Sequence, residues 1–92
     1  MVKTLMHHKV QDFEKWKKAF EGFAETRKKA GEVDYSVGTL QNEPNTAYVI
    51  NTWKNIEQFE AFFGAAELKE AMGAAGVLEA PTVIILNEMD KG

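Results

Sequence analysis

The sequence predicts an α+β protein of the split βαβ type, with the element order β-α-β-β-α-β. The first observation is an internal repeat, because residues 10–16 (VQDFEKW) align without a gap on residues 53–59 (WKNIEQF). In each copy a strand residue precedes a helix cap, an acid in the first helical turn and two large apolar side chains three positions apart. The second observation is a turn at residues 42–45 between the two copies. One domain over residues 1–92 with a four-stranded antiparallel sheet is therefore expected.

The first half is predicted to be a strand over residues 2–10 and a helix that Asp12 caps. Gly31 is predicted to end this helix, because glycine readily adopts the left-handed backbone of a helix C-terminus. Large aromatic residues recur along it at spacings of three and four, which indicates a single apolar stripe. The stripe consists of Phe13, Trp16, Phe20 and Phe23.

Two strands are predicted in the middle of the chain, joined as a hairpin. Residues 32–41 place Val33, Tyr35 and Val37 at alternate positions, the pattern of a half-buried strand. The segment Asn42-Glu43-Pro44-Asn45 is the expected turn, because proline fixes its own φ and asparagine tolerates positive φ. The next strand is expected over residues 47–54.

The second half is predicted to repeat the strand-to-helix junction. Asn55 caps the second helix, and Gln58 three residues later completes a capping-box pattern. We expect Gly64 to divide this helix in two and Gly76 to end it. The last strand is expected over residues 82–89.

Composition narrows the classes of function. The chain has 92 residues, 45% of them hydrophobic, and a net charge of −3, with lysines interleaved with glutamates rather than gathered in a stripe. A nucleic-acid surface is therefore not expected. The absence of cysteine excludes disulfides, thiolate catalysis and zinc-ribbon sites, and it suits a reducing cytoplasm. No run approaches the roughly 20 apolar residues of a membrane span, so no membrane association is expected.

The predicted sheet has two apolar faces but only one layer of helices. In the last strand Val83 and Ile85 share one face, and Ile84 and Leu86 share the other. An uncovered apolar face of several hundred square ångströms is large for a monomer. We therefore expect a homodimer in which two sheets pack face to face and enclose a ligand cavity. Val49 and Trp53 are expected in that interface.

Two segments carry a resemblance to a known family: residues 8–16 (HKVQDFEKW) and the sequence Asn51-Thr52-Trp53 just before the Asn55 cap. The chain resembles the dimeric α/β-barrel superfamily, and within it the antibiotic-biosynthesis-monooxygenase-like (ABM-like) families of cofactor-free or haem-using proteins. The resemblance implies a ferredoxin-like fold that pairs into a dimeric barrel. It also implies that Trp53 borders the cavity between the sheets. Haem-degrading members use a histidine on the second helix, and residues 56–75 contain none. Haem is therefore not expected, and no other cofactor or metal is predicted.

Candidate site residues follow from the strand faces. Asn51 lies two residues before Trp53 and shares its face. His7 and His8 point to opposite faces, so they cannot chelate one metal together and only one of them reaches the cavity. The resemblance favours His8, which could act as a general base near neutral pH. Tyr35 could add a hydroxyl group to the same site, and so could Tyr48.

Each candidate also has a purely structural interpretation. Trp53 could be interface core, Asn51 could bond a neighbouring strand and His8 could be a hydrogen-bonded structural histidine. The sequence thus predicts a small-molecule-binding homodimer in which catalysis is left open. The alternative is a cofactor-independent, monooxygenase-like, isomerase-like or cyclase-like enzyme. It would act on a small aromatic or polyketide-like substrate, from which His8 removes a proton so that the carbanion meets oxygen.

Overall fold

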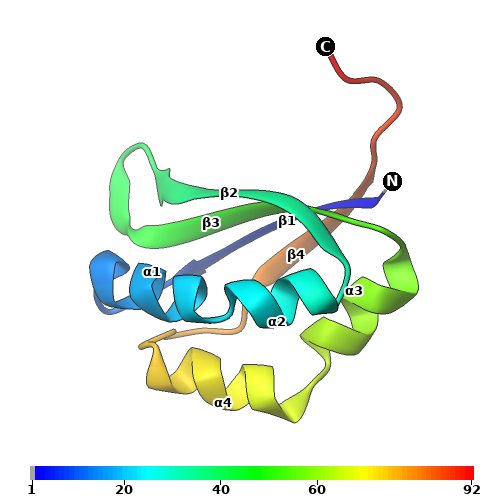
Figure 1. Cartoon of the computed structure of the whole chain (residues 1–92). Helices are drawn as coiled ribbons and strands as arrows, with labels where there is room; N and C mark the ends of the chain where they lie inside the picture. The colour runs from blue at the N-terminus through cyan, green and yellow to red at the C-terminus, as the bar shows by residue number, and fades with distance from the viewer. Residues whose placement is uncertain (1) are drawn as a thin grey trace.

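The computed structural model describes residues 2–92, so of the predicted domain only Met1 lies outside the described residues. The elements follow in the order β1 (Val2–Lys9), α1 (Phe13–Gly22), α2 (Ala24–Lys29), β2 (Glu32–Leu40), β3 (Glu43–Trp53), α3 (Ile56–Phe63), α4 (Ala66–Ala74) and β4 (Thr82–Asn87). The strands form one antiparallel sheet in the order β2-β3-β1-β4. All the helices lie on one side of it (Figure 1). The predicted ferredoxin-like α+β fold is confirmed.

The first helical segment differs from the prediction of one continuous helix. Asp12 caps α1 as expected, since its Oδ1 accepts a hydrogen bond of 3.0 Å from the backbone N–H of Glu14. The helix divides at Phe23, whose N–H bonds to the carbonyl of Phe20 three residues back and ends α1. A second short helix, α2, then runs to Lys29 before Gly31, at φ 109°, turns the chain into β2.

The hairpin turn falls two residues earlier than predicted, and β3 is longer. The turn is at Gln41 and Asn42, and β3 already begins at Glu43, so Pro44 belongs to the strand. Proline is tolerated there because the pairing of β1 with β3 stops at Thr46, which leaves Pro44 beyond the end of β1. Its missing N–H therefore costs no ladder hydrogen bond to β1.

The second half follows the prediction closely. The Oδ1 of Asn55 accepts a hydrogen bond of 2.8 Å from the N–H of Gln58, and the helical segment divides after Phe63 into α3 and α4. The strand β4 is shorter than predicted and ends at Asn87. Within residues 2–92, the chain forms no helix with the length and apolar character that a membrane crossing requires.

The helices bury one face of the sheet and leave the other bare. The covered face carries Val49 and Trp53, which are 2% and 0% exposed. Their burial under helices of the same chain shows that the expectation of these two residues in a dimer interface is wrong. The opposite face, which we call the bare face, presents apolar side chains from three strands that lie side by side in the sheet register. These are Leu5, Tyr48, Ile50, Ile84 and Leu86.

Candidate functional site

A cavity of about 70 Å³ lies between the covered face of the sheet and the helices. Its wall is largely aromatic and aliphatic, and its polar members are His8, Arg27 and Asn51. The remaining lining residues are Met6, Trp16, Ala19, Phe20, Phe23, Val49, Trp53, Phe62, Phe63, Leu68, Ala71, Met72 and Ala75. An apolar cavity with a few convergent polar groups is the usual form of a small-molecule site.

The structure brings three of the predicted site residues together, at a different place from the one expected. His8 projects from β1, and Asn51 and Trp53 project from the adjacent strand β3, all into this cavity. The cavity belongs to a single chain and lies under its own helices. The expected location of these residues between two sheets is therefore wrong, because the strand parity that groups them does not reveal which face the helices cover.

Two other predicted site residues lie elsewhere. His7 is on the bare face, opposite Tyr48 on β3 and Thr82 on β4. Tyr35 is 48% exposed and packs its ring edge-on against Phe20, with 5.2 Å between the ring centroids, outside the cavity lining. Neither residue joins the group formed by His8, Asn51 and Trp53.

His8 is a buried imidazole with an open nitrogen. The residue is 3% exposed and lies edge-on to the ring of Trp16, with 5.5 Å between the ring centroids. Its Nδ1 has no hydrogen-bond partner among residues 2–92. Burial lowers the pKa of His8 from its ordinary value of 6.5, a shift that its own backbone and, to a smaller extent, the nearby carboxylate of Glu79 partly oppose. The ring is therefore neutral at pH 7 and able to accept a proton.

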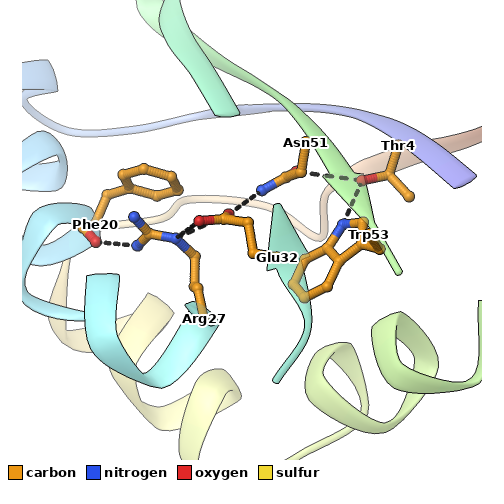
Figure 2. Close-up of polar contacts among 6 residues, drawn as sticks. All are labelled: Thr4, Phe20, Arg27, Glu32, Asn51 and Trp53. Carbon is orange, nitrogen blue, oxygen red and sulfur yellow. Dashed lines mark hydrogen bonds and ion pairs between the residues drawn. The ribbon is translucent and has the colours of Figure 1, made fainter. Parts of the chain in front are cut away.

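A directed chain of hydrogen bonds fixes the amide of Asn51 (Figure 2). The indole Nε1 of Trp53 donates to Oγ1 of Thr4 at 3.1 Å, and this hydroxyl donates to Oδ1 of Asn51 at 3.2 Å. The Nδ2 of Asn51 donates in turn to Oε2 of Glu32 at 2.6 Å. Because the indole at one end can only donate and the carboxylate at the other end can only accept, the amide of Asn51 has a single favourable orientation.

This chain of hydrogen bonds ends at a buried ion pair between Arg27 and Glu32. The Nε of Arg27 lies 3.1 and 3.0 Å from the two carboxylate oxygens, and both side chains are less than one tenth exposed. Its Nη1 donates to the carbonyl of Phe20, and its Cζ lies 3.6 Å above the centre of the Phe20 ring. In the described part of the chain the third nitrogen, Nη2, has no hydrogen-bond partner.

Thr4, Arg27 and Glu32 are functional candidates that sequence reasoning missed. Arg27 lies in a lysine-rich stretch (TRKK) that is typical of a solvated helix face. A signal was nevertheless present, because position 27 continues the apolar stripe, four residues after Phe23. An arginine on the buried stripe of a helix requires a partner, and Glu32 is the nearest acid after it in the sequence.

The polar groups do not form a metal site. Residues 2–92 contain no cluster of three or more histidine, cysteine, aspartate or glutamate side chains placed to hold a metal ion. The groups that the cavity does offer are a neutral imidazole, an oriented amide and a guanidinium in an apolar enclosure.

Comparison with known proteins places the fold. No family model matches the sequence, and no curated protein matches it. Among solved structures, SnoaB from Streptomyces nogalater, a cofactor-independent oxygenase, matches with a TM-score of 0.77 and 13% identity over 98% of this chain and 94% of its own. A proposed antibiotic biosynthesis monooxygenase from Caulobacter crescentus matches with a TM-score of 0.77 and 19% identity, over 97% of this chain and 90% of its own. Another from Bordetella bronchiseptica matches with a TM-score of 0.78 and 13% identity, over 96% of each chain.

These matches cover nearly the whole chain, so the chain has the ferredoxin-like α+β fold of antibiotic biosynthesis monooxygenase proteins. The resemblance that residues 8–16 and 51–55 suggested is confirmed at the level of the fold.

Proposed function

We propose that the protein binds a small, mainly apolar organic molecule in the cavity between its sheet and its helices, and that it does so as a homodimer. The observation that carries the proposal is the wall itself, because an aromatic enclosure contains an imidazole nitrogen that has no partner within residues 2–92. A buried polar atom without a hydrogen-bond partner lowers the stability of the folded protein. A ligand group would satisfy it.

The size of the cavity implies that one element moves when a ligand enters. At about 70 Å³ the cavity is smaller than the roughly 150 Å³ known to admit benzene. Helix α4 contributes Leu68, Ala71 and Met72 to the wall, yet none of its residues is buried. Since little burial holds α4 in place, its outward movement is the least costly way to enlarge the cavity.

Tryptophan fluorescence tests this binding function, because Trp16 and Trp53 both line the cavity. Titration with indane, an apolar two-ring hydrocarbon, is expected to change the emission in a saturable way. The variant Ala71→Phe, which fills the wall from α4, is expected to abolish the change without unfolding the protein. An indane response that is absent, or that Ala71→Phe leaves unaltered, would contradict the proposal.

The homodimer is supported by the bare face. Its exposed apolar residues include Ile84 and Leu86, which are 44% and 42% exposed. A second copy packed on this face would cover them. In such a dimer each chain keeps its own cavity, because the cavity lies on the other side of the sheet.

A second candidate function, cofactor-independent oxygenation, is favoured by the state of His8. A neutral buried imidazole can remove a proton from an acidic C–H group, and the resulting carbanion can react with oxygen. With 1,3-dihydroxynaphthalene, one O₂ would give the hydroxynaphthoquinone and one water, so the reaction needs no external reductant. The fold likeness to SnoaB supports the same class of chemistry.

Oxygen uptake with 1,3-dihydroxynaphthalene tests this second function. His8→Ala is expected to lower the rate by roughly 10²- to 10⁴-fold, the usual contribution of a general base. His7→Ala, the neighbouring histidine on the bare face, is the matched control and is expected to retain the rate. A His8→Ala variant that keeps the rate but loses stability would make His8 a structural residue and remove the only base of the scheme.

A further inference from the structure

Arg27 has more hydrogen-bond capacity than the fold uses. A guanidinium carries five N–H groups, one on Nε and two on each terminal nitrogen. The Nε group is directed to Glu32 and Nη1 bonds to the Phe20 carbonyl, whereas the two N–H groups of Nη2 find no acceptor in residues 2–92 (Figure 2). Arg27 is 2% exposed, so water does not readily replace the missing acceptor. It lines the cavity, so a ligand can supply that acceptor.

We infer that Nη2 of Arg27 forms a subsite that selects ligands carrying an uncharged oxygen acceptor, such as a ketone carbonyl, over carboxylates and over plain hydrocarbons. The inference deepens the proposed function, since it rests on ligand binding in the same cavity. It makes Arg27 a specificity-determining residue.

The preference for an uncharged oxygen follows from the charges already present. Glu32 balances the guanidinium charge at 3.0 Å, and Asn51 donates a further hydrogen bond to the same carboxylate. A ligand carboxylate would bring a second negative charge beside Glu32 and leave a buried excess of negative charge, which is strongly unfavourable. A carbonyl oxygen accepts the hydrogen bond without adding a charge. The site therefore favours the carbonyl.

The surroundings of the subsite define the rest of the ligand. The rings of His8, Trp16 and Phe20 follow one another at 5.5 and 5.4 Å between centroids, and the guanidinium lies over Phe20. Two aromatic rings thus separate the open imidazole nitrogen from the open guanidinium nitrogen. A flat ring system with one carbonyl matches this wall, because its body contacts the aromatic rings while its oxygen reaches Arg27.

The alternative is that Arg27 only holds Glu32 and, through it, the amide of Asn51. Such a structural arginine would not distinguish one ligand oxygen from another. The two interpretations therefore differ in ligand preference, which can be measured on the unaltered protein.

The experiment compares 1-indanone, indane and indane-1-carboxylate by calorimetry with the full chain. We expect 1-indanone to bind about tenfold or more tightly than indane, the contribution of one hydrogen bond to a charged donor, and indane-1-carboxylate to bind more weakly than 1-indanone. Equal affinities for 1-indanone and indane would overturn the inference while leaving the proposed function intact. The absence of binding by both would overturn the two together. A carboxylate that binds best would show that the subsite selects anions and would also overturn the inference.

A variant links the preference to Arg27. Arg27→Lys keeps a positive charge opposite Glu32 but has a single nitrogen, so its preference for 1-indanone over indane is expected to fall to less than about threefold. Lys28→Gln, on the exposed side of the same helix, is the matched control and is expected to retain the preference. If Arg27→Lys retains it, the inference is wrong.

An infrared measurement on the wild-type protein keeps the test decisive if Arg27→Lys does not fold. The carbonyl stretch of bound 1-indanone is expected at lower frequency than that of 1-indanone in an apolar solvent, because a hydrogen bond weakens the C=O bond. A bound frequency equal to that in apolar solvent would overturn the inference.

Discussion

At the scale of single residues, two nitrogen atoms define what the cavity can do. Nδ1 of His8 and Nη2 of Arg27 are the buried side-chain polar atoms that find no partner among residues 2–92. Hydrogen bonds connect the side chains from Trp53 through Thr4, Asn51 and Glu32 to Arg27. These bonds fix the orientation of the connected groups, whereas the two open atoms are available to a ligand.

Burial of His8 makes stability depend on pH. Its pKa in the folded chain lies below 6.5, so the unfolded chain binds more protons between the two values and stability falls as the pH is lowered through 6.5 towards the folded value. Above 6.5 the contribution of His8 is fully present. We expect the wild-type free energy of unfolding to fall more steeply between pH 7.5 and 5 than that of His8→Leu, measured by denaturant titration. Parallel curves for the two proteins would contradict this expectation.

Sequence reasoning found part of the site at this scale and missed part. Strand parity groups Asn51 with Trp53, and the resemblance favours His8 over His7. The structure places His8, Asn51 and Trp53 in the cavity lining. Arg27 and Glu32 escaped because their partnership forms only after the chain has turned at Gly31, so no local pattern links them. Thr4 escaped because a strand threonine carries no signal that its hydroxyl will meet an indole and an amide.

At the scale of elements, the turn at Gly31 connects the helical layer to the sheet. Gly31 has a φ of 109°, its carbonyl accepts a hydrogen bond from the N–H of Lys54 at 3.0 Å, and an added Cβ would lie 2.8 Å from the side chain of Gln58. The turn places Arg27 and Glu32 on either side of it, so its geometry also positions their ion pair. It was predictable from the sequence, whereas the break at Phe23 was not, because an aromatic residue carries no stop signal.

Replacing Gly31 tests the importance of this turn. Gly31→Ala is expected to cost about 1–2 kcal/mol or more in the free energy of unfolding, because an L-residue is strained at this φ and its Cβ meets Gln58. Gly22→Ala is the matched control, since nothing lies within 4 Å of a Cβ at that helical position. It is expected to be neutral or to stabilise by up to about 1 kcal/mol. Equal effects of the two substitutions in thermal unfolding would contradict this account.

At the scale of the whole molecule, the sheet has two apolar faces and one layer of helices. This arrangement is the basis of two proposals, the ligand cavity inside each chain and the homodimer. The fold was predictable because the internal repeat and the alternation of apolar residues act over short distances. The location of the cavity was not, because alternation gives two faces without saying which of them the helices cover. Val49 and Trp53 were assigned to the wrong side for this reason.

The bare face predicts the oligomeric state. Ile50 lies beside Leu5 of β1 in the centre of this face, so Ile50→Asp would place an unpaired charge in an interface formed there, at a cost of several kcal/mol. The variant is expected to be monomeric by light scattering at micromolar concentration, where the wild type is expected to be a dimer. Ile85→Asp is the matched control, because Ile85 lies on the opposite face and is 54% exposed. A monomeric wild type would refute the homodimer.

The central claim is that the ligand site lies inside each chain, between the sheet and the helices. The most direct measurement is a crystal structure of the wild-type protein with 1-indanone bound. We expect electron density for the ring between Trp16 and Trp53, with α4 displaced outward relative to the rest of the chain. Density for 1-indanone between two sheets on the bare face, with the helix-covered cavity unchanged, would contradict it.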